Sequence, residues 1–145
     1  MTEPPDQPGC NVDGFPLQAL TATIIASSFT VFRKFGYGFL EGVYRRALAV
    51  ELRHRGVPIE EEAKYELFHH GQLVGAYRAD LVVDSRVIVE SKTGAVLDPT
   101  APVQLLNYLC AAQLGLGLVI HFGPRGARAK RVIAAWPETG VARDS

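Results

Sequence analysis

The sequence predicts a single α/β domain of the α+β kind, with a mixed, mainly antiparallel sheet flanked by helices in the order ααβββαββ. Three observations predict this order. Apolar residues recur every three or four positions up to Gly56, which is typical of amphipathic helices. After Pro58 apolar and polar residues alternate, which is typical of strands, and helical spacing returns after Pro99. With 145 residues, the chain has the length of one domain.

The first two helices are expected over residues 17–34 and 39–55. Each has one apolar face, and glycines end both helices: Gly36 and Gly38 follow the first, and Gly56 follows the second. Serine and threonine interrupt the first apolar stretch, which falls short of the roughly 20 apolar residues that span a bilayer. We therefore expect a buried helix and no membrane contact.

Three antiparallel strands are expected between Pro58 and Val89, joined by short turns at residues 70–72 and 84–85. A third helix, led by Pro99, is expected to extend to about residue 114. Its buried stripe should consist of Val103, Leu106, Leu109 and Cys110. The last expected elements are a buried strand over 116–122, a turn over 123–126 and a strand over 129–136.

The predicted domain covers residues 15–136, between tails at 1–14 and 137–145. A chain with 48% hydrophobic and 21% charged residues is globular rather than disordered. Fifteen Lys and Arg residues balance fifteen Asp and Glu residues, so an anionic partner requires a local basic patch. Residues 1–13 contain acidic residues but no Lys or Arg, unlike a secretory signal, and we expect a cytoplasmic protein.

The sharpest chemical feature is an apolar strand that ends in Glu90-Ser91-Lys92. Because side chains alternate along a strand, Glu90 and Lys92 share a face. If the preceding hairpin loop has three residues, Asp80 lies opposite Glu90, with Cβ atoms about 5 Å apart. Such neighbouring carboxylates repel each other, and Mg²⁺ or Mn²⁺ would offset that cost. A two-residue loop would instead place them on opposite faces.

A structural alternative remains open for these carboxylates. On a solvated sheet face, Asp80 and Glu90 would pair with Arg78 or Lys92, as most surface carboxylates pair with nearby cations. An isolated Glu-x-Lys sequence does not decide between the two interpretations, because such short motifs also occur by chance.

Two basic groups are candidates for binding nucleic-acid phosphates. The group in the last hairpin consists of Arg125, Arg128, Lys130 and Arg131. The group along the second helix consists of Arg45, Arg46, Arg53, His54 and Arg55. Nearby glutamates can balance the helical group, so we favour the hairpin group as the binding surface.

Several motifs in a fixed order extend the analysis beyond single residues. They are Gly38-Phe39-Leu40-Glu41-Gly42-Val43-Tyr44, Arg78-Ala79-Asp80-Leu81-Val82-Val83, Val89-Glu90-Ser91-Lys92, Gln104-Leu105-Leu106-Asn107-Tyr108 and Ile120-His121-Phe122-Gly123. Together they resemble the GxxExxY protein family of the PD-(D/E)XK nuclease superfamily, from about residue 17 to residue 133. The resemblance implies a restriction-endonuclease-like core with a metal site built from these motifs.

By position in the resemblance, Glu41, Asp80 and Glu90 are the expected metal ligands, with Mg²⁺ or Mn²⁺ as the ion. The same three residues, with Lys92 and Gln104, form the expected catalytic set. Tyr108 is i+4 from Gln104, so both share one helix face. Tyr108 is also a candidate for stacking on bases, although aromatic residues beside an apolar helix stripe more often belong to the core.

Two departures from the family pattern bear on activity. Thr93 follows Lys92, where a small apolar residue is usual, and Ala101-Pro102-Val103 precedes Gln104 without the usual histidine. His121 stands where asparagine is common, and we expect it to be a core or edge histidine with one hydrogen bond.

The leading hypothesis is a metal-dependent nuclease-like protein that hydrolyses phosphodiester bonds, in DNA rather than RNA. The alternative is a non-catalytic module that retains the fold and binds nucleic acid or a protein. A third interpretation is a homodimer formed through the first helix, which would leave an apolar face exposed on the monomer.

Overall fold

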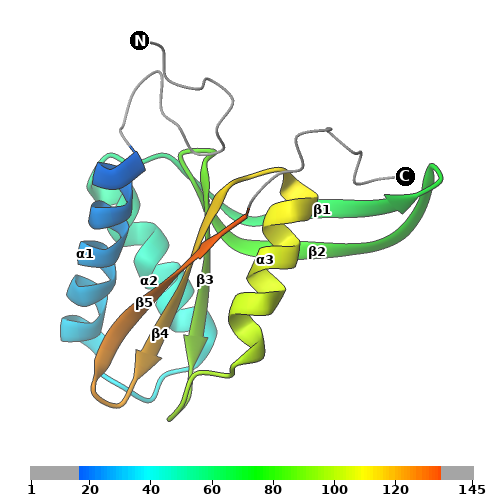
Figure 1. The fold of residues 1–145 in the computed structure, drawn as a ribbon. Helices are drawn as coiled ribbons and strands as arrows, with labels where there is room; N and C mark the ends of the chain where they lie inside the picture. Colours follow the sequence, from blue (N-terminus) through cyan, green and yellow to red (C-terminus); the bar gives the residue numbers. More distant parts are fainter. Residues whose placement is uncertain (1–16, 135–145) are drawn as a thin grey trace.

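The computed structural model describes residues 17–134, in which eight elements follow the predicted order (Figure 1). The helices are α1 (Leu17–Phe35), α2 (Glu41–His54) and α3 (Thr100–Ala112). The strands are β1 (Ile59–His69), β2 (Gln72–Val83), β3 (Val87–Thr93), β4 (Leu116–Gly123) and β5 (Gly126–Ile133). The order ααβββαββ is confirmed. The predicted tails lie outside the described residues.

The five strands form one sheet in the order β1-β2-β3-β4-β5. Strands β3 and β4 are parallel, and every other neighbouring pair is antiparallel. Parallel neighbours require a crossover connection, which α3 provides between β3 and β4. The prediction of a mixed, mainly antiparallel sheet is therefore confirmed.

The helices cover both faces of this sheet (Figure 1). Helices α1 and α2 pack on one face, where Ile24 and Leu48 meet Leu118 and Phe122. Helix α3 packs on the other face, where Leu105 and Leu109 meet a second set of apolar side chains, Val82, Ile88 and Val119. The apolar alternation of the central strands thus divides the core into two layers.

The β1–β2 hairpin extends beyond its pairing with β3. Strand β1 pairs with β2 over nearly its whole length, whereas β2 pairs with β3 only from Leu81 to Val83. Figure 1 shows the hairpin curving away from β3 toward its turn at His70-Gly71. Both turn residues have positive φ (48° and 75°), as a two-residue hairpin requires. Strands β2 and β3 therefore separate just before Leu81.

The buried stripe of α3 differs from the prediction. Val103 and Leu106 are 60% and 37% exposed, whereas Ala101, Leu105 and Leu109 are buried. Apolar residues lie on two sides of this helix, and only the side that contains Leu105 packs tightly against the sheet. Gly117 in β4 leaves the space for this contact, because a Cβ atom there would lie 2.8 Å from a methyl carbon of Leu105.

The last strand also begins earlier than expected, at Gly126 rather than Ala129. Gly123 pairs with Gly126, so a two-residue turn at Pro124-Arg125 closes the hairpin. The strand ends at Ile133, and the expected continuation to Trp136 lies outside the described residues.

Among residues 17–134, no helix is both long and apolar enough to cross a membrane.

Replacement of Gly117 by alanine should destabilise the protein by about 1–3 kcal/mol, because the added methyl group overpacks the contact between β4 and α3. Gly75→Ala in β2 is the matched control, since its Cβ would meet only Leu67 at an ordinary 3.7 Å. Chemical denaturation measures both effects. Equal stability of the two variants would contradict the close packing of Leu105 on β4.

Candidate metal centre and nucleic-acid surface

The candidate site begins where β2 and β3 separate. Val83 pairs with Val87 and Leu81 with Val89, so the hairpin loop has three residues and the two-residue alternative is wrong. Beyond Leu81, side chains continue the link between the strands. The amide N–H of Asp80 donates to Oε2 of Glu90 (3.1 Å), and the amide N–H of Ser91 donates to Oδ2 of Asp80 (2.9 Å). The two carboxylates therefore lie beside each other.

Glu90 is buried, and Asp80 is half-buried. Glu90 is only 7% exposed, and burial, reinforced by the negative charge of Asp80, raises its pKa to about 8. Burial also raises the pKa of Asp80, against the opposing effects of the Ser91 amide and the cations Arg45 and Lys92. No salt bridge of the described residues joins either carboxylate to Arg78 or Lys92. The interpretation as a solvated sheet face is therefore wrong.

Glu41 reaches the same neighbourhood from the first turn of α2. Partial burial raises its pKa, while the charge of Lys92 lowers that pKa and the charge of Asp80 raises it. Lys92 also lowers the pKa of Glu90. The fold thus brings Glu41, Asp80, Glu90 and Lys92 within electrostatic range of one another, although they come from three different elements.

Tyr44 fixes the segment that leads to Glu41. Its ring is fully buried and stacks on Phe122, with centroids 4.5 Å apart. Its hydroxyl donates to the carbonyl of Gly36 (2.5 Å) and accepts the amide N–H of Phe39 (3.3 Å). The tyrosine of the motif between Gly38 and Tyr44 is therefore a core residue that positions the start of α2.

Arg45 is a site residue that the sequence analysis placed only in the basic group of the second helix. It lies one turn after Glu41 and lowers the pKa of both Glu41 and Asp80. Its guanidinium is 3.5 Å from Glu62, and its buried Nε has no hydrogen-bond partner. The i,i+4 spacing from Glu41 is the signal that could have identified it.

Two other arginines of that basic group are neutralised. Arg53 pairs with Glu61 at 2.9 Å, and Arg55 pairs with Glu51 at 2.8 Å. The expectation that glutamates balance this group is confirmed for both residues.

Tyr108 lies between the aromatic core and the carboxylates. Its ring stacks on Tyr77 with centroids 3.9 Å apart, and Tyr77 stacks on Tyr65 at 5.2 Å. Burial raises the pKa of Tyr108, and the charges of Glu90 and Asp80 raise it further. One ring face is therefore occupied by Tyr77.

Gln104 is exposed. It lies one helical turn before Tyr108 on α3, and this spacing places both residues on the same side of the helix.

The sheet register divides the basic residues of the last hairpin between two faces. Lys92 pairs with His121, which pairs with Arg128, and the neighbouring row contains Glu90 and Lys130. Paired residues point to the same side of a sheet, so Arg128 and Lys130 share the face of the carboxylates. Arg131 alternates with them and points to the opposite face. Arg125 lies in the turn.

The chain matches one known family over most of its length. The sequence profile of the PD-(D/E)XK nuclease superfamily matches residues 18–132. The chain belongs to this superfamily. No curated protein sequence matches the chain.

A similar fold is found among solved structures. The crystal structure of SSO0001 matches with a TM-score of 0.54 and 18% sequence identity, over 68% of this chain and 52% of that chain. The chain thus spans about half the length of SSO0001. A phage-related exonuclease from Haemophilus somnus 129PT matches with a TM-score of 0.44 and 12% identity, over 81% of this chain and 72% of that chain. The superfamily match and the fold shared with SSO0001 confirm the restriction-endonuclease-like core.

PD-(D/E)XK nucleases generally use divalent metals. The carboxylates of Asp80 and Glu90, at the point where β2 and β3 separate, suit such an ion. Within residues 17–134, Asp80 and Glu90 each accept one backbone hydrogen bond through one oxygen, which leaves Oδ1 and Oε1 as hard ligands. The described part of the chain contains no cluster of three or more His, Cys, Asp or Glu side chains arranged around one ion. Two neighbouring carboxylates are hard oxygen donors of the kind that bind divalent cations.

The raised pKa of Glu90 should make metal-free stability depend on pH. The folded state keeps the proton up to about pH 8, whereas a glutamate carboxyl in the unfolded chain loses it near pH 4.5. The resulting stabilisation is complete below pH 4.5 and is lost as pH rises through 8. In EDTA, the unfolding free energy should fall by on the order of a few kcal/mol across that window. Denaturation of wild type and Glu90→Gln measures this, and equal slopes would contradict it.

Proposed function

We propose that the chain is a divalent-metal-dependent nuclease of the GxxExxY group that hydrolyses phosphodiester bonds. The observation that supports this most strongly is that half-buried Asp80 lies beside buried Glu90, with Lys92 on the same face of the sheet. Two neighbouring acids that are partly removed from water lower the stability of the fold, and a metal site explains why both are present.

Each residue of the site has a role in this proposal. Asp80 and Glu90 hold the ion, with Glu41 binding through water from α2. A bound divalent ion lowers the pKa of its water and neutralises charge that develops on the phosphoryl oxygens. Lys92 orients or deprotonates the attacking water, and Gln104 helps to orient it. Water adds to phosphorus, one P–O ester bond breaks, and the leaving oxygen takes up a proton.

Nucleic acid is the substrate that the surrounding charge supports, with DNA rather than RNA as our proposal. Arg125, Arg128 and Lys130 take part in no salt bridge of the described residues, in contrast to the paired arginines of α2. Unpaired cations on the face of the carboxylates can neutralise backbone phosphates without first breaking an ion pair.

A second candidate function is a binding module that retains the fold without cleaving its ligand. The observation that favours it is that both carboxylates also link β2 to β3 through backbone hydrogen bonds. This structural role could preserve the pair in a chain that has lost catalysis.

Cleavage of labelled DNA and RNA with Mg²⁺ or Mn²⁺ separates the two functions. The wild type should cut, and Asp80→Asn and Lys92→Ala should each lower the rate roughly 10²–10⁴-fold, because each removes a group that acts on the reacting atoms. Lys64→Ala and Glu66→Gln are the matched controls, since these exposed residues of β1 pair with each other.

Thermal unfolding of every variant verifies that the fold is intact. Metal-dependent cutting that survives in folded Asp80→Asn and Lys92→Ala would contradict the proposed site. If the wild type binds DNA but cuts nothing, the binding module becomes the better account.

A further inference from the structure

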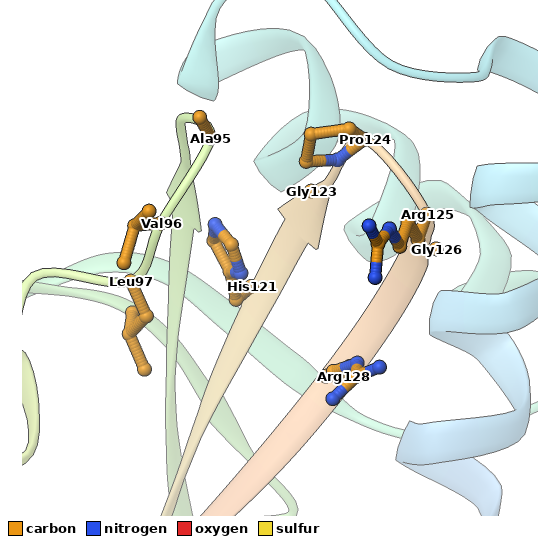
Figure 2. Close-up of a pocket in the computed structure, with 9 residues that line it drawn as sticks. All are labelled: Ala95, Val96, Leu97, His121, Gly123, Pro124, Arg125, Gly126 and Arg128. Atoms are coloured by element: carbon orange, nitrogen blue, oxygen red, sulfur yellow. The ribbon is translucent and has the colours of Figure 1, made fainter.

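A pocket of about 520 Å³ lies between the loop that follows β3 and the β4–β5 turn. Figure 2 shows the ring of His121 between residues 95–97 on one side and Arg125 and Arg128 on the other. None of the residues that line the pocket is acidic. Three nitrogen-bearing side chains therefore surround a space that contains no opposing negative side chain.

The sheet register places this pocket beside the candidate metal centre. His121 pairs with Lys92 on β3, and Arg128 pairs with His121 from β5. Neighbouring strands lie about 4.8 Å apart, so the pocket begins one strand away from Lys92 on the same face. A polymer bound at Asp80 and Glu90 can pass directly into it.

The pocket is built rather than incidental, because its imidazole is held from two sides. His121 is 9% exposed, and its Nε2–H donates to the carbonyl of Gly94 (2.8 Å). A Cβ atom on Gly123 would lie 2.8 Å from the ring carbon Cε1 of His121. Glycine at this position therefore leaves room for the ring.

The two guanidinium groups supply the charge of the pocket. No ion pair of the described residues includes Arg125 or Arg128. Guanidinium forks match the oxygens of a phosphate group and bind it through paired hydrogen bonds. Val96, which is 80% exposed, adds an apolar contact at the rim that suits a sugar or base.

We infer that this pocket binds one phosphate group of the nucleic-acid strand, close to the bond positioned at Asp80 and Glu90. Arg125 and Arg128 bind the phosphate oxygens, and His121 forms the floor. The identity of the ligand as a nucleic-acid strand rests on the proposed function. The phosphate is either an internal phosphodiester or a terminal monophosphate, and both present the same oxygens.

Titration with inorganic phosphate tests the pocket without reference to cleavage. The His121 ring signals in NMR spectra of the wild type should shift and saturate. Arg125→Gln/Arg128→Gln should weaken this binding about tenfold or more, because it removes both charged donors. Gly123→Ala should also weaken it by displacing the ring. Arg131→Gln, on the same strand but the opposite face, should leave the titration unchanged.

DNA binding in EDTA, measured by fluorescence anisotropy, identifies the source of the phosphate. The salt dependence is the slope of log Kd against log salt concentration. If the double variant loses one phosphate contact, this slope should fall by about 0.7 for a single strand or about 0.9 for a duplex. A loss shared by oligonucleotides with and without terminal phosphates indicates an internal phosphodiester. A loss confined to 5′- or 3′-phosphorylated strands indicates a terminal monophosphate.

Two results would overturn the inference: no saturable shift of His121 in the wild type, or equal weakening by Arg131→Gln, which would indicate a general charge effect. A specific phosphate response in a protein that cuts no substrate would support the pocket while the proposed nuclease activity fails. The two proposals therefore fail separately.

Discussion

Where β2 and β3 separate, carboxylate side chains take the place of the backbone-to-backbone hydrogen bonds between the strands. Asp80 and Glu90 each accept an amide N–H from the opposite strand, so the strands remain joined while the β1–β2 hairpin turns away. The register of the β2–β3 hairpin puts the two acids and Lys92 on the same face, and this linkage holds the acids beside each other there. The proposed metal centre depends on it.

This arrangement has an electrostatic cost that the surrounding elements reduce. Burial raises the pKa of both acids, and the charge of Asp80 raises the pKa of Glu90 further, while Arg45 and Lys92 oppose the effect of burial at Asp80. Arg45 comes from α2, whose start is fixed by the buried ring of Tyr44. Helix α2 therefore contributes to the site as well as to the core. A divalent cation would complete the compensation, since its charge exceeds that of one ammonium group.

The sequence predicts more of the backbone than of the side-chain contacts. Helical and strand periodicities determine the eight elements, and the three-residue hairpin loop determines that Asp80 and Glu90 share a face. The choice between two apolar stripes on α3 depends on Gly117 of β4, which is distant in sequence and therefore invisible to periodicity. The participation of Arg45 depends likewise on the packing of α2 against the sheet. Local patterns specify elements, and long-range packing specifies which side chains meet.

The most direct test of a metal centre where β2 and β3 separate is a crystal structure of the wild type with Mn²⁺, examined by anomalous scattering. We predict a peak in contact with the carboxylate oxygens of both Asp80 and Glu90, at about 2.1–2.2 Å, close to the distances of other small divalent ions. A structure at saturating Mn²⁺ with no peak there, or with the ion bound only elsewhere, would contradict the account.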